Sequence, residues 1–383
     1  MGGIVGIRNP DRRQMISMLG IAGMSSLGGA AHSQPATTAP GIDRLYRGSI
    51  VIDCLASPNS WNVPYPKPGP LTPQQLHNVQ ASGITAINLT VGSTALDDAV
   101  KQIGLYLDQI DRHPDIFLLV KRPADILAAK RQGKLGLIFG FQGLGMIGED
   151  IGLVDAFAGI PVKIMQLTYN DENSVGAGSS LPDTHGLTPF GHQVVARLNE
   201  LGVVVDVAHA NPRTALDANA ASMRPIIISH TGCRAIYPSQ RNMPDEVLRA
   251  VADKGGVVGI YLMPFLGKDP VAPSRALALR HIEHAIQICG EDHVGIGSDQ
   301  SITPIDPSPG YMAAVREIAR QRQAKGIGAP GEADSPVMVP ELNSPRRLEM
   351  IGSVLLKAGH SVSLVEKVIG GNFNRIFGEI WPA

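Results

Sequence analysis

Residues 203–230 read VVVDVAHANPRTALDANAASMRPIIISH. They contain two short apolar runs, Val203–Ala208 and Pro225–Ser229, and a histidine directly follows each run, His209 and His230. Apolar runs without strict alternation are typical of strands that are buried on both faces, as in a parallel sheet covered by helices. The pattern therefore predicts two neighbouring parallel strands, joined by a helix, that each end on an imidazole.

The same alternation continues on both sides of this stretch. Six further apolar runs of this kind are Ser49–Asp53, Ile84–Val91, Leu135–Phe141, Val162–Thr168, Gly256–Leu262 and Val294–Ser298. Helical spacing lies between them, as in Ala99–Arg112 and Pro189–Leu201, and the latter helix is expected to begin with Thr188 as its cap. Eight strands separated by helices within about 250 residues predict an α/β fold of the (β/α)₈ TIM-barrel type.

Two later segments are expected to pack on the outside of this barrel. Residues 303–344 are rich in proline and glycine and predict a long loop and a helix over the top of the barrel. Residues 346–383 predict terminal helices against its side. No Gly-x-Gly-x-x-Gly motif follows an early strand, so a dinucleotide-binding fold lacks its main support.

Composition excludes several classes of protein. Among 383 residues, 44% are apolar and 17% are charged, which argues against intrinsic disorder. The 33 basic and 34 acidic residues give a net charge of −1, so no electrostatic footprint for nucleic acid is present. Three scattered cysteines do not suggest a disulfide framework.

The first 33 residues have the layout of an export signal. Arg12 and Arg13 precede a short apolar core at residues 15–24, and small residues follow up to Ser33. Adjacent arginines before a mildly apolar, glycine-rich core predict a twin-arginine signal and a periplasmic protein. The core is short for a membrane anchor, and no later stretch is long and apolar enough to cross a bilayer. We therefore expect a signal at residues 1–33 and a single barrel domain at residues 34–383.

Candidate site residues lie where barrel enzymes place their chemistry, at the carboxyl ends of the strands. His209 and His230 end the fifth and sixth predicted strands, and Asp299 ends the eighth. Imidazoles bind divalent transition metals, and a carboxylate can take a proton from a metal-bound water. Any one of them alone is more often a satisfied polar residue, but three at the same end of the barrel favour an active site. By contrast, His281 and His284 have the spacing of a metal pair but are expected on a solvated helix surface.

Seven ordered blocks of the sequence are distinctive: Gln166-Leu167-Thr168-Tyr169-Asn170, Gly186-Leu187-Thr188-Pro189-Phe190-Gly191, Asp206–His209, Ser229-His230-Thr231-Gly232-Cys233-Arg234-Ala235, Arg241-Asn242-Met243-Pro244-Asp245, His293–Asp299 and Gly371-Asn372-Phe373. In these blocks the sequence resembles the membrane (renal) dipeptidase family of zinc-dependent hydrolases, which are metal-bearing (β/α)₈ barrels related to the amidohydrolases. The resemblance runs from about Val51 to Phe377 and implies a two-metal centre with a bridging carboxylate and the cleavage of dipeptides.

The resemblance also implies roles for individual residues. His209 and His230 match the ligands of the family's second metal, and Asp299 matches the acid/base that handles the proton of the nucleophile. Arg241 matches the residue that holds the carboxylate of the substrate, for which a planar guanidinium is well suited. Tyr169 stands where the renal enzymes carry a histidine that contacts the substrate, and we expect it to contact the substrate here. A homodimer is compatible with the resemblance.

Three positions depart from the family. The His and Asp that bind its first metal fall on Leu55 and Ser57, and its bridging glutamate falls on Gln142. Leucine cannot bind a metal, and a neutral amide is a poor bridge between two dications. A single Zn²⁺ on His209 and His230 is therefore expected, with Gln142 or Asp299 and water completing its shell.

Two residues near the lost ligands, Asp53 and Cys54, are candidate replacements. By strand parity, Asp53 is expected on the same side as Leu55 but deeper in the barrel, and Cys54 is expected outside, against a helix. Core packing is the simpler interpretation for both.

Three hypotheses follow from these expectations. The first is an exported metallohydrolase that cleaves a dipeptide or a related small amide with one metal or an atypical pair. The second is a barrel without dipeptidase activity that performs another reaction on a small carboxylate-bearing substrate. The third is a protein that only binds such a ligand. The first leads because the imidazole pair, the acid and the arginine are all retained.

Overall fold

The structure, a computed structural model, describes residues 41–59, 69–267, 273–306, 308–324 and 338–382. The chain divides into two units, Met1–Thr37 and Thr38–Ala383, and all of the described residues belong to the second. The export signal predicted at residues 1–33 lies outside the described residues. That signal and the domain boundary after it stay predictions.

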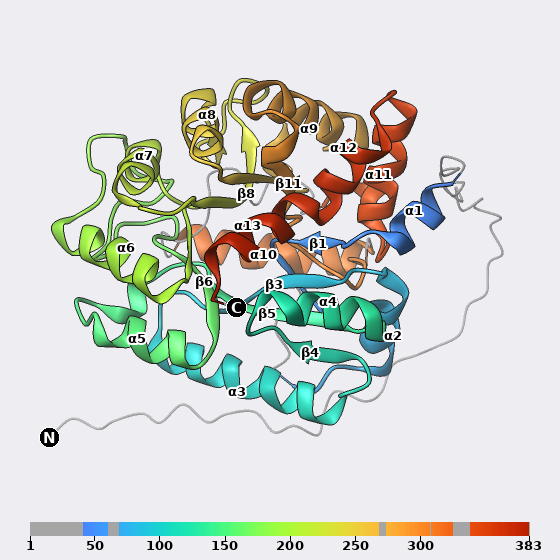
Figure 1. Ribbon diagram of the computed structural model, residues 1–383, viewed down its shortest axis with the longest axis horizontal. Coiled ribbons are helices and arrows are strands. Elements are labelled where there is room, and N and C mark those ends of the chain that lie inside the picture. Colours follow the sequence, from blue (N-terminus) through green and yellow to red (C-terminus); the bar gives the residue numbers. More distant parts are fainter. Residues whose placement is uncertain (1–40, 60–68, 268–272, 307, 325–337, 383) are drawn as a thin grey trace, which may run out of the picture. The chain divides into compact units, whose positions relative to one another are not determined.

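Eight parallel strands form one continuous sheet in chain order (Figure 1). They are β1 (Ile52–Asp53), β3 (Ala86–Gly92), β5 (Leu135–Phe141), β6 (Val162–Gln166), β7 (Val204–Asp206), β8 (Ile227–Cys233), β10 (Val257–Ile260) and β11 (Val294–Ile296). Each overlaps one of the eight apolar runs, so the strand predictions are confirmed. The main difference is β8, which continues past Ser229 and takes His230 into the strand itself.

The two ends of this sheet meet, which closes the barrel. The amide of Cys54, just after β1, donates to the carbonyl of Ile296 in β11 at 2.9 Å. Beyond that contact, β2 (Ala56–Ser57) pairs in parallel with β12 (Gln300–Ser301). The predicted (β/α)₈ barrel is therefore confirmed. Four short strands were not predicted from the sequence: β2 and β12, β4 (Phe117–Leu119) beside β5, and β9 (Asn242–Met243) beside β8.

Helices alternate with the strands around the barrel. They are α1 (Ile42–Gly48), α2 (Pro73–Ser82), α3 (Leu96–Arg112), α4 (Pro123–Gln132), α5 (Gly152–Gly159), α6 (Pro189–Leu201), α7 (Pro212–Ala221), α8 (Asp245–Asp253), α9 (Arg275–Cys289), α10 (Pro309–Ala324), α11 (Arg347–Lys357), α12 (Val362–Glu366) and α13 (Asn372–Ile380). The expected start of α6 is confirmed, since the Thr188 side chain accepts a hydrogen bond from the amide of Gly191. Helix α3 begins three residues earlier than expected, at Leu96.

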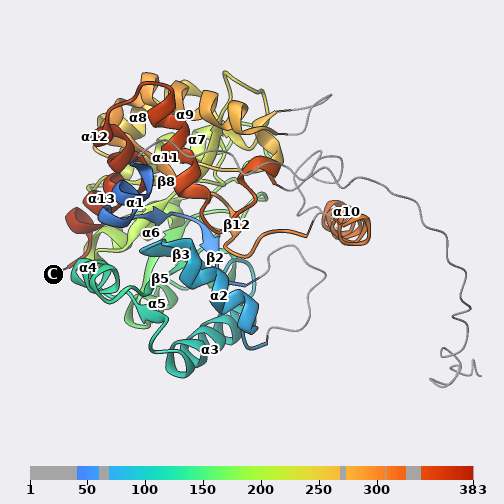
Figure 2. The ribbon, with the colours of Figure 1, turned by 90° about the vertical axis from the view of Figure 1, so that its right-hand side faces the viewer.

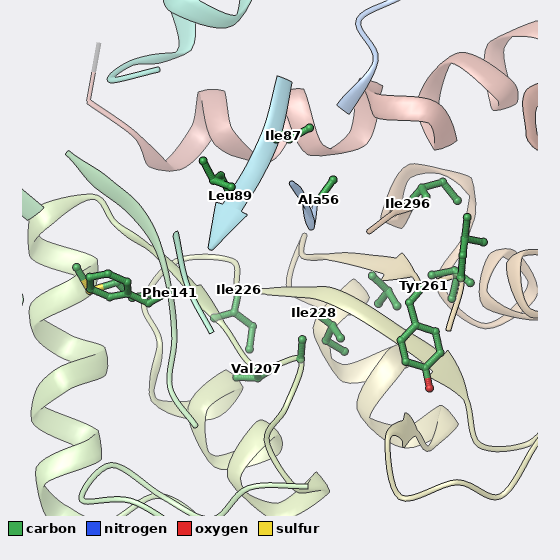
Figure 3. Close-up of a cluster of buried hydrophobic side chains, with 14 of the residues drawn as sticks. Ala56, Ile87, Leu89, Phe141, Val207, Ile226, Ile228, Tyr261 and Ile296 are labelled. Atoms are coloured by element: carbon green, nitrogen blue, oxygen red, sulfur yellow. The ribbon is translucent and has the colours of Figure 1, made fainter. Parts of the chain in front are cut away.

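Apolar side chains fill the barrel and the layer around it. One buried cluster takes residues from seven strands together with α13: Ile52, Cys54, Ala86, Ile138, Ile164, Val204, Ile227, Val257, Phe373, Ile376 and Phe377 are among its members. A larger cluster lies between the strands and the surrounding helices, and Figure 3 shows part of it, including Ile87 and Leu89 on β3. Alternate residues of β3 thus belong to different layers, as strand geometry requires.

Helices α10 and α13 lie at opposite ends of the barrel (Figures 1 and 2). The indole of Trp381, just after α13, donates to the carbonyl of Lys163 at the start of β6, and Asn372 donates to Val294 at the start of β11. Helix α13 therefore covers the amino-terminal end, so the expectation that all terminal helices pack against the side of the barrel is wrong for α13. Helix α10 lies toward the carboxyl end, as expected for the described part of residues 303–344.

The orientation predicted for Asp53 and Cys54 is wrong. The Asp53 carboxylate accepts hydrogen bonds from Ser298, 2.7 Å from the backbone amide and 2.6 Å from the hydroxyl, and lies 3.8 Å from Arg347 of α11. It therefore faces the helical layer, whereas Cys54 belongs to the interior cluster. The chain bends at Cys54 and Leu55, between β1 and β2, so the two-residue period cannot be carried across them. Neither residue replaces a lost metal ligand at the mouth.

Candidate active site

The imidazoles of His209 and His230 come together at the carboxyl ends of neighbouring strands, as predicted. His209 lies three residues beyond β7, and His230 lies within β8. Their ring centroids are 4.9 Å apart at an interplanar angle of 61°. Both side chains are buried, with 4% and 0% exposure. Buried imidazoles this close together must share one small space at the mouth of the barrel.

A hydrogen-bond chain fixes the tautomer of His230. The backbone amide of Ser229 donates to Asp206 Oδ1 at 2.9 Å, and the Ser229 hydroxyl donates to Asp206 Oδ2. That hydroxyl has a single hydrogen, so toward His230 Nδ1, 2.8 Å away, it acts as an acceptor. Nδ1 of His230 therefore carries the proton. Nε2 is left with its lone pair and is buried without a hydrogen-bond partner among the described residues.

His209 has the same tautomer as His230, but a different partner, Asn170, fixes it. Its Nδ1 lies 2.7 Å from Oδ1 of Asn170, which can only accept, so Nδ1 carries the proton and Nε2 holds the lone pair. The ring of Tyr169 stacks on the His209 ring, with centroids 4.2 Å apart and an interplanar angle of 20°. Both imidazoles are thus held as Nδ1–H tautomers, the form in which Nε2 can bind a metal or accept a proton.

The surroundings keep both imidazoles neutral. Burial lowers the pKa of His209 and of His230 well below the usual value, and the positive charge of Arg241 lowers both further. For His209, the neighbouring His230 and the guanidinium of Arg322 act in the same direction. Neutral imidazoles are lone-pair donors, which is the form required of metal ligands.

Arg241 lies just before β9 and is held from two sides. Its Nη1 donates to the carbonyl of Ala208 at 2.7 Å, and its guanidinium lies 5.9 Å from the centroid of the Tyr261 ring. The Tyr261 hydroxyl is in turn bonded to Asn242. The side chain is 3% exposed. These contacts fix a guanidinium beside the backbone of His209, where it can receive an anion.

Asp299 lies where the barrel closes, between β11 and β12. Its amide donates to the carbonyl of Leu55 at 2.8 Å, and within the described ranges it is the one non-glycine residue with a positive φ, 54°. Aspartate tolerates this left-handed conformation better than most residues, and such conformations often occur at functional sites. The structure thus places Asp299 at the mouth, in an unusual backbone conformation that turns the chain from β11 into β12.

The side chains at the family's first metal and bridging positions do not fit a two-metal centre. Leu55 is buried and apolar, and Ser57 and Gln142 carry no charge. Gln142 is held through its backbone, donating to Gly92 at 3.0 Å and accepting from the Gln166 amide. Across the described ranges, no three His, Cys, Asp or Glu side chains are grouped so that they could hold an ion. Asp299 is therefore not brought together with the two imidazoles as a third ligand.

What does fit an ion is the pair of Nε2 lone pairs on His209 and His230. Catalytic zinc normally has three protein ligands, so two imidazoles alone predict weak binding that depends on water or substrate. Among the described residues, the hydrogen bonds of Gln142 involve its backbone alone, so the expected contribution of its side chain to the metal shell stays a prediction.

The interpretation of His281 as a surface residue is wrong. Its side chain is fully buried in α9, where Nδ1 accepts from the amide of Cys233 at 2.9 Å and Nε2 donates to the carbonyl of Leu266 at 2.7 Å. His284 lies 2.8 Å from a carboxylate oxygen of Asp245 and is partly exposed. Both ring nitrogens of His281 are thus used to join β8, α9 and the turn at Leu266.

Several residues that shape the site were not predicted from the sequence. Asp206 and Asn170 were visible as polar residues in or directly after buried strands, and both lay within the family blocks, but no role was drawn for them. Arg322 of α10 donates to the hydroxyl of Tyr169 at 3.1 Å. Nothing in the local sequence of α10 marks this arginine, because its partner lies 153 residues away in the chain.

A closed parallel (β/α)₈ barrel with imidazoles at its carboxyl end defines the class of metallopeptidase and amidohydrolase barrels. Residues 72–321 match the family described as membrane dipeptidase (Peptidase family M19). This match covers most of the chain, and the protein belongs to that family.

Individual relatives agree with this assignment. The chain is 26% identical over 293 residues to dipeptidase tcpJ of Claviceps purpurea (strain 20.1), a match that covers 76% of this chain and 61% of that protein. The match thus spans about three fifths of the relative's length. A crystal structure of an amidohydrolase from Pseudomonas aeruginosa has a TM-score of 0.77 and 29% identity, covering 89% of this chain and 99% of the other.

More distant structures share the fold. The probable dipeptidase PvdM from Pseudomonas aeruginosa has a TM-score of 0.70 at 19% identity, covering 89% of this chain and 97% of its own. A metallo peptidase from Rhodobacter sphaeroides, liganded with a phosphinate mimic of the dipeptide L-Ala-D-Ala, has a TM-score of 0.69 at 19% identity, covering 87% of this chain and 100% of its own. At this level of identity the similarity establishes the barrel.

Proposed function

We propose that this protein is a hydrolase that cleaves a dipeptide or a related small amide with a free carboxylate, at a single metal ion held by His209 and His230. The observation that carries the proposal is the pair of neutral, buried imidazoles with Nε2 lone pairs, one of which has no hydrogen-bond partner in the described part of the chain. Membership in the dipeptidase family supports the hydrolase class.

Three residues of the chain have separate roles in substrate binding and proton transfer. Arg241 binds the substrate carboxylate through its planar guanidinium, and its contacts with Ala208 and Tyr261 hold it in place. Tyr169 contacts the substrate beside His209, and Asp299 holds and returns the proton of the attacking water. When bound, a divalent zinc ion supplies polarisation of the scissile carbonyl and a lowered pKa of coordinated water.

The alternative is a barrel that performs another reaction on a small carboxylate-bearing ligand, or only binds it. The neutral side chains of Leu55, Ser57 and Gln142 favour this alternative, since two-metal hydrolysis needs charged ligands there. Arg241 would keep its role in this case, and the two imidazoles would contact the ligand directly.

The proposal includes export to the periplasm by a twin-arginine signal at residues 1–33, with assembly as a homodimer. Among the described residues, none of the helices combines the length and apolar character that crossing a bilayer requires. Cell fractionation with amino-terminal sequencing of the recovered protein tests export, and light scattering tests the dimer.

The decisive experiment measures metal content and hydrolysis of a dipeptide panel together. We expect about one metal ion per chain, lost in both His209→Ala and His230→Ala, with hydrolysis lost in parallel. His360→Ala is the matched control, because this partly exposed histidine pairs with Glu283 outside the site. Two tightly bound ions with turnover would refute the single-metal site. No metal and no hydrolysis of any dipeptide would favour the alternative function.

A further inference from the structure

A second guanidinium reaches the mouth of the barrel from outside it. Arg322 lies near the end of α10, and its Nη2 donates to the hydroxyl of Tyr169 at 3.1 Å. The ring of that tyrosine stacks on His209, 4.2 Å between centroids. Arg322 is therefore linked to the His209 imidazole through Tyr169, although it lies on helix α10 and not on a strand of the barrel.

The first guanidinium approaches the same imidazole by another route. Arg241 donates to the carbonyl of Ala208, the residue before His209. Arg322 reaches the other side of this imidazole through Tyr169, which accepts its hydrogen bond and stacks on the His209 ring, so both guanidinium groups flank His209. Two positive charges near one imidazole favour anions in that space and disfavour a second cation.

The site carries fewer negative charges than the family's two-metal centre, because the residues that depart from the family are neutral. Leu55, Ser57 and Gln142 bring no charge to positions where the family's metal ligands would bring two carboxylates. Two carboxylates at the strand ends are already engaged. Asp206 accepts from Ser229 and from the amide of Ala208, and Asp53 pairs with Arg347 on the helical side.

We propose that Arg322 forms a second anion-binding position, so that the preferred substrate is a dipeptide or related amide with two carboxylates. The terminal carboxylate binds Arg241, and the side-chain carboxylate of an acidic residue binds Arg322 beside Tyr169. This inference rests on the proposed function and names its substrate class. Arginine suits the role because its fork can bind a carboxylate while another of its N–H groups keeps the bond to Tyr169.

Matched glutamate and glutamine substrates test this directly, since they differ in charge and hardly in size. The full-length protein is assayed on Glu-Ala against Gln-Ala and on Ala-Glu against Ala-Gln. We expect the glutamate member of at least one pair to have a kcat/KM about 10-fold or more above that of its glutamine partner, as a charge-assisted hydrogen bond provides. The preference should lie mainly in KM and should fall as salt is added.

Arg322→Gln should abolish that preference and lower the kcat/KM of the glutamate substrates far more than that of the glutamine substrates, because glutamine carries no charge that could pair with the second carboxylate. Arg320→Gln is the matched control. Arg320 lies two residues earlier in α10, is exposed and pairs with Glu317. If Arg322 only held α10 to the barrel, its removal would reduce activity on charged and neutral substrates alike.

Three results would overturn the inference: no glutamate preference in either pair, an unchanged preference in Arg322→Gln, or an equal loss on all substrates in that variant. If the wild type cleaves no dipeptide, the proposed hydrolase function fails separately. Calorimetric binding of Glu-Ala and Gln-Ala to the same three proteins then decides the inference by the same comparison.

Discussion

The hydroxyl of Ser229 lies 2.8 Å from Nδ1 of His230 and gives its only hydrogen to Asp206. The serine thus fixes which nitrogen of His230 is protonated and leaves Nε2 available at the mouth. Partners of this kind orient metal-binding histidines and raise their basicity, and they are often as important as the ligands themselves. The role of Ser229 here is positional, since it acts through His230.

Ser229→Ala should therefore weaken metal binding. Without the hydroxyl, the Nδ1–H tautomer is no longer favoured, and we expect the metal Kd to rise about 10- to 100-fold. The free energy of unfolding should also fall by about 1–3 kcal/mol, because the buried Asp206 carboxylate loses the hydrogen bond that the Ser229 hydroxyl donates to it. Metal titration against a competing chelator measures the first effect, and chemical denaturation measures the second.

Ser222→Ala is the control for this variant. Ser222 is also buried and hydrogen-bonded, to Asn199, but it lies at the end of α7, before β8 begins, and has no contact with His230 among the described residues. The Ser222→Ala variant should have a lower free energy of unfolding than the wild type, whereas its metal Kd should be unchanged. An unchanged metal Kd in Ser229→Ala itself would show that Ser229 does not set the state of His230.

The barrel could be predicted because its strands are continuous apolar runs, buried on both faces, and each run is long enough to be recognised. The pairing of His209 with His230 followed from the same fact, since the carboxyl ends of neighbouring parallel strands meet. The three-residue strand β4 was missed because a run as short as Phe117–Leu119 carries no pattern that distinguishes it from a loop.

Other features depend on contacts that sequence patterns do not contain. The bend between β1 and β2 reversed the expected sides of Asp53 and Cys54. His281 is buried because a backbone amide and a backbone carbonyl from distant segments satisfy both of its nitrogens. Arg322 reaches the site only because α10 crosses the mouth of the barrel. Such contacts are set by tertiary packing, which local periodicity does not encode.

Arg241→Met should raise KM for dipeptides with a free carboxyl terminus by about 10- to 100-fold, the loss of a charge-assisted contact of about 1.5–3 kcal/mol. The reason is that methionine keeps much of the side-chain volume but cannot bind an anion. Dipeptide amides, which lack the terminal carboxylate, serve as the control substrate and should show little further change. An equal loss on dipeptides and their amides would mean that Arg241 supports the backbone at Ala208 rather than the substrate.

Stability should depend on pH through Asp53. Burial raises the pKa of this carboxyl from 3.8 to about 6, although Arg347 and the bonds from Ser298 act in the opposite direction. Because the folded pKa lies above the unfolded value, the folded state binds the proton more tightly. The stabilisation is complete below about pH 4 and is lost as the pH rises through about 6. A shift of roughly two units corresponds to about 3 kcal/mol.

Chemical denaturation of the wild type and of Asp53→Asn between pH 4 and pH 7.5 measures this effect. The unfolding free energy of the wild type, relative to that of the variant, should fall by up to about 3 kcal/mol between pH 4 and pH 6.5 and then level off. Asp111→Asn, on the exposed surface of α3, is the control and should run parallel to the wild type. A difference that rises with pH would contradict the sign assigned to Asp53.

The missing ligands of the first metal can be put back together, as Leu55→His, Ser57→Asp and Gln142→Glu. If the neutral side chains at these three positions are what limits the site to one ion, the triple variant should bind about two ions per chain, because a histidine and two carboxylates restore a donor set for a second dication. Metal analysis after dialysis gives the stoichiometry. Leu55→His alone is the matched control and should stay near one ion, since a single added imidazole supplies neither the second ligand nor the bridge.

An occupancy that stays at one in the triple variant would mean that Arg241 and Arg322 keep the site too positive for a second ion. In that case, adding Arg322→Gln to the triple variant should raise the occupancy, whereas Arg320→Gln should not.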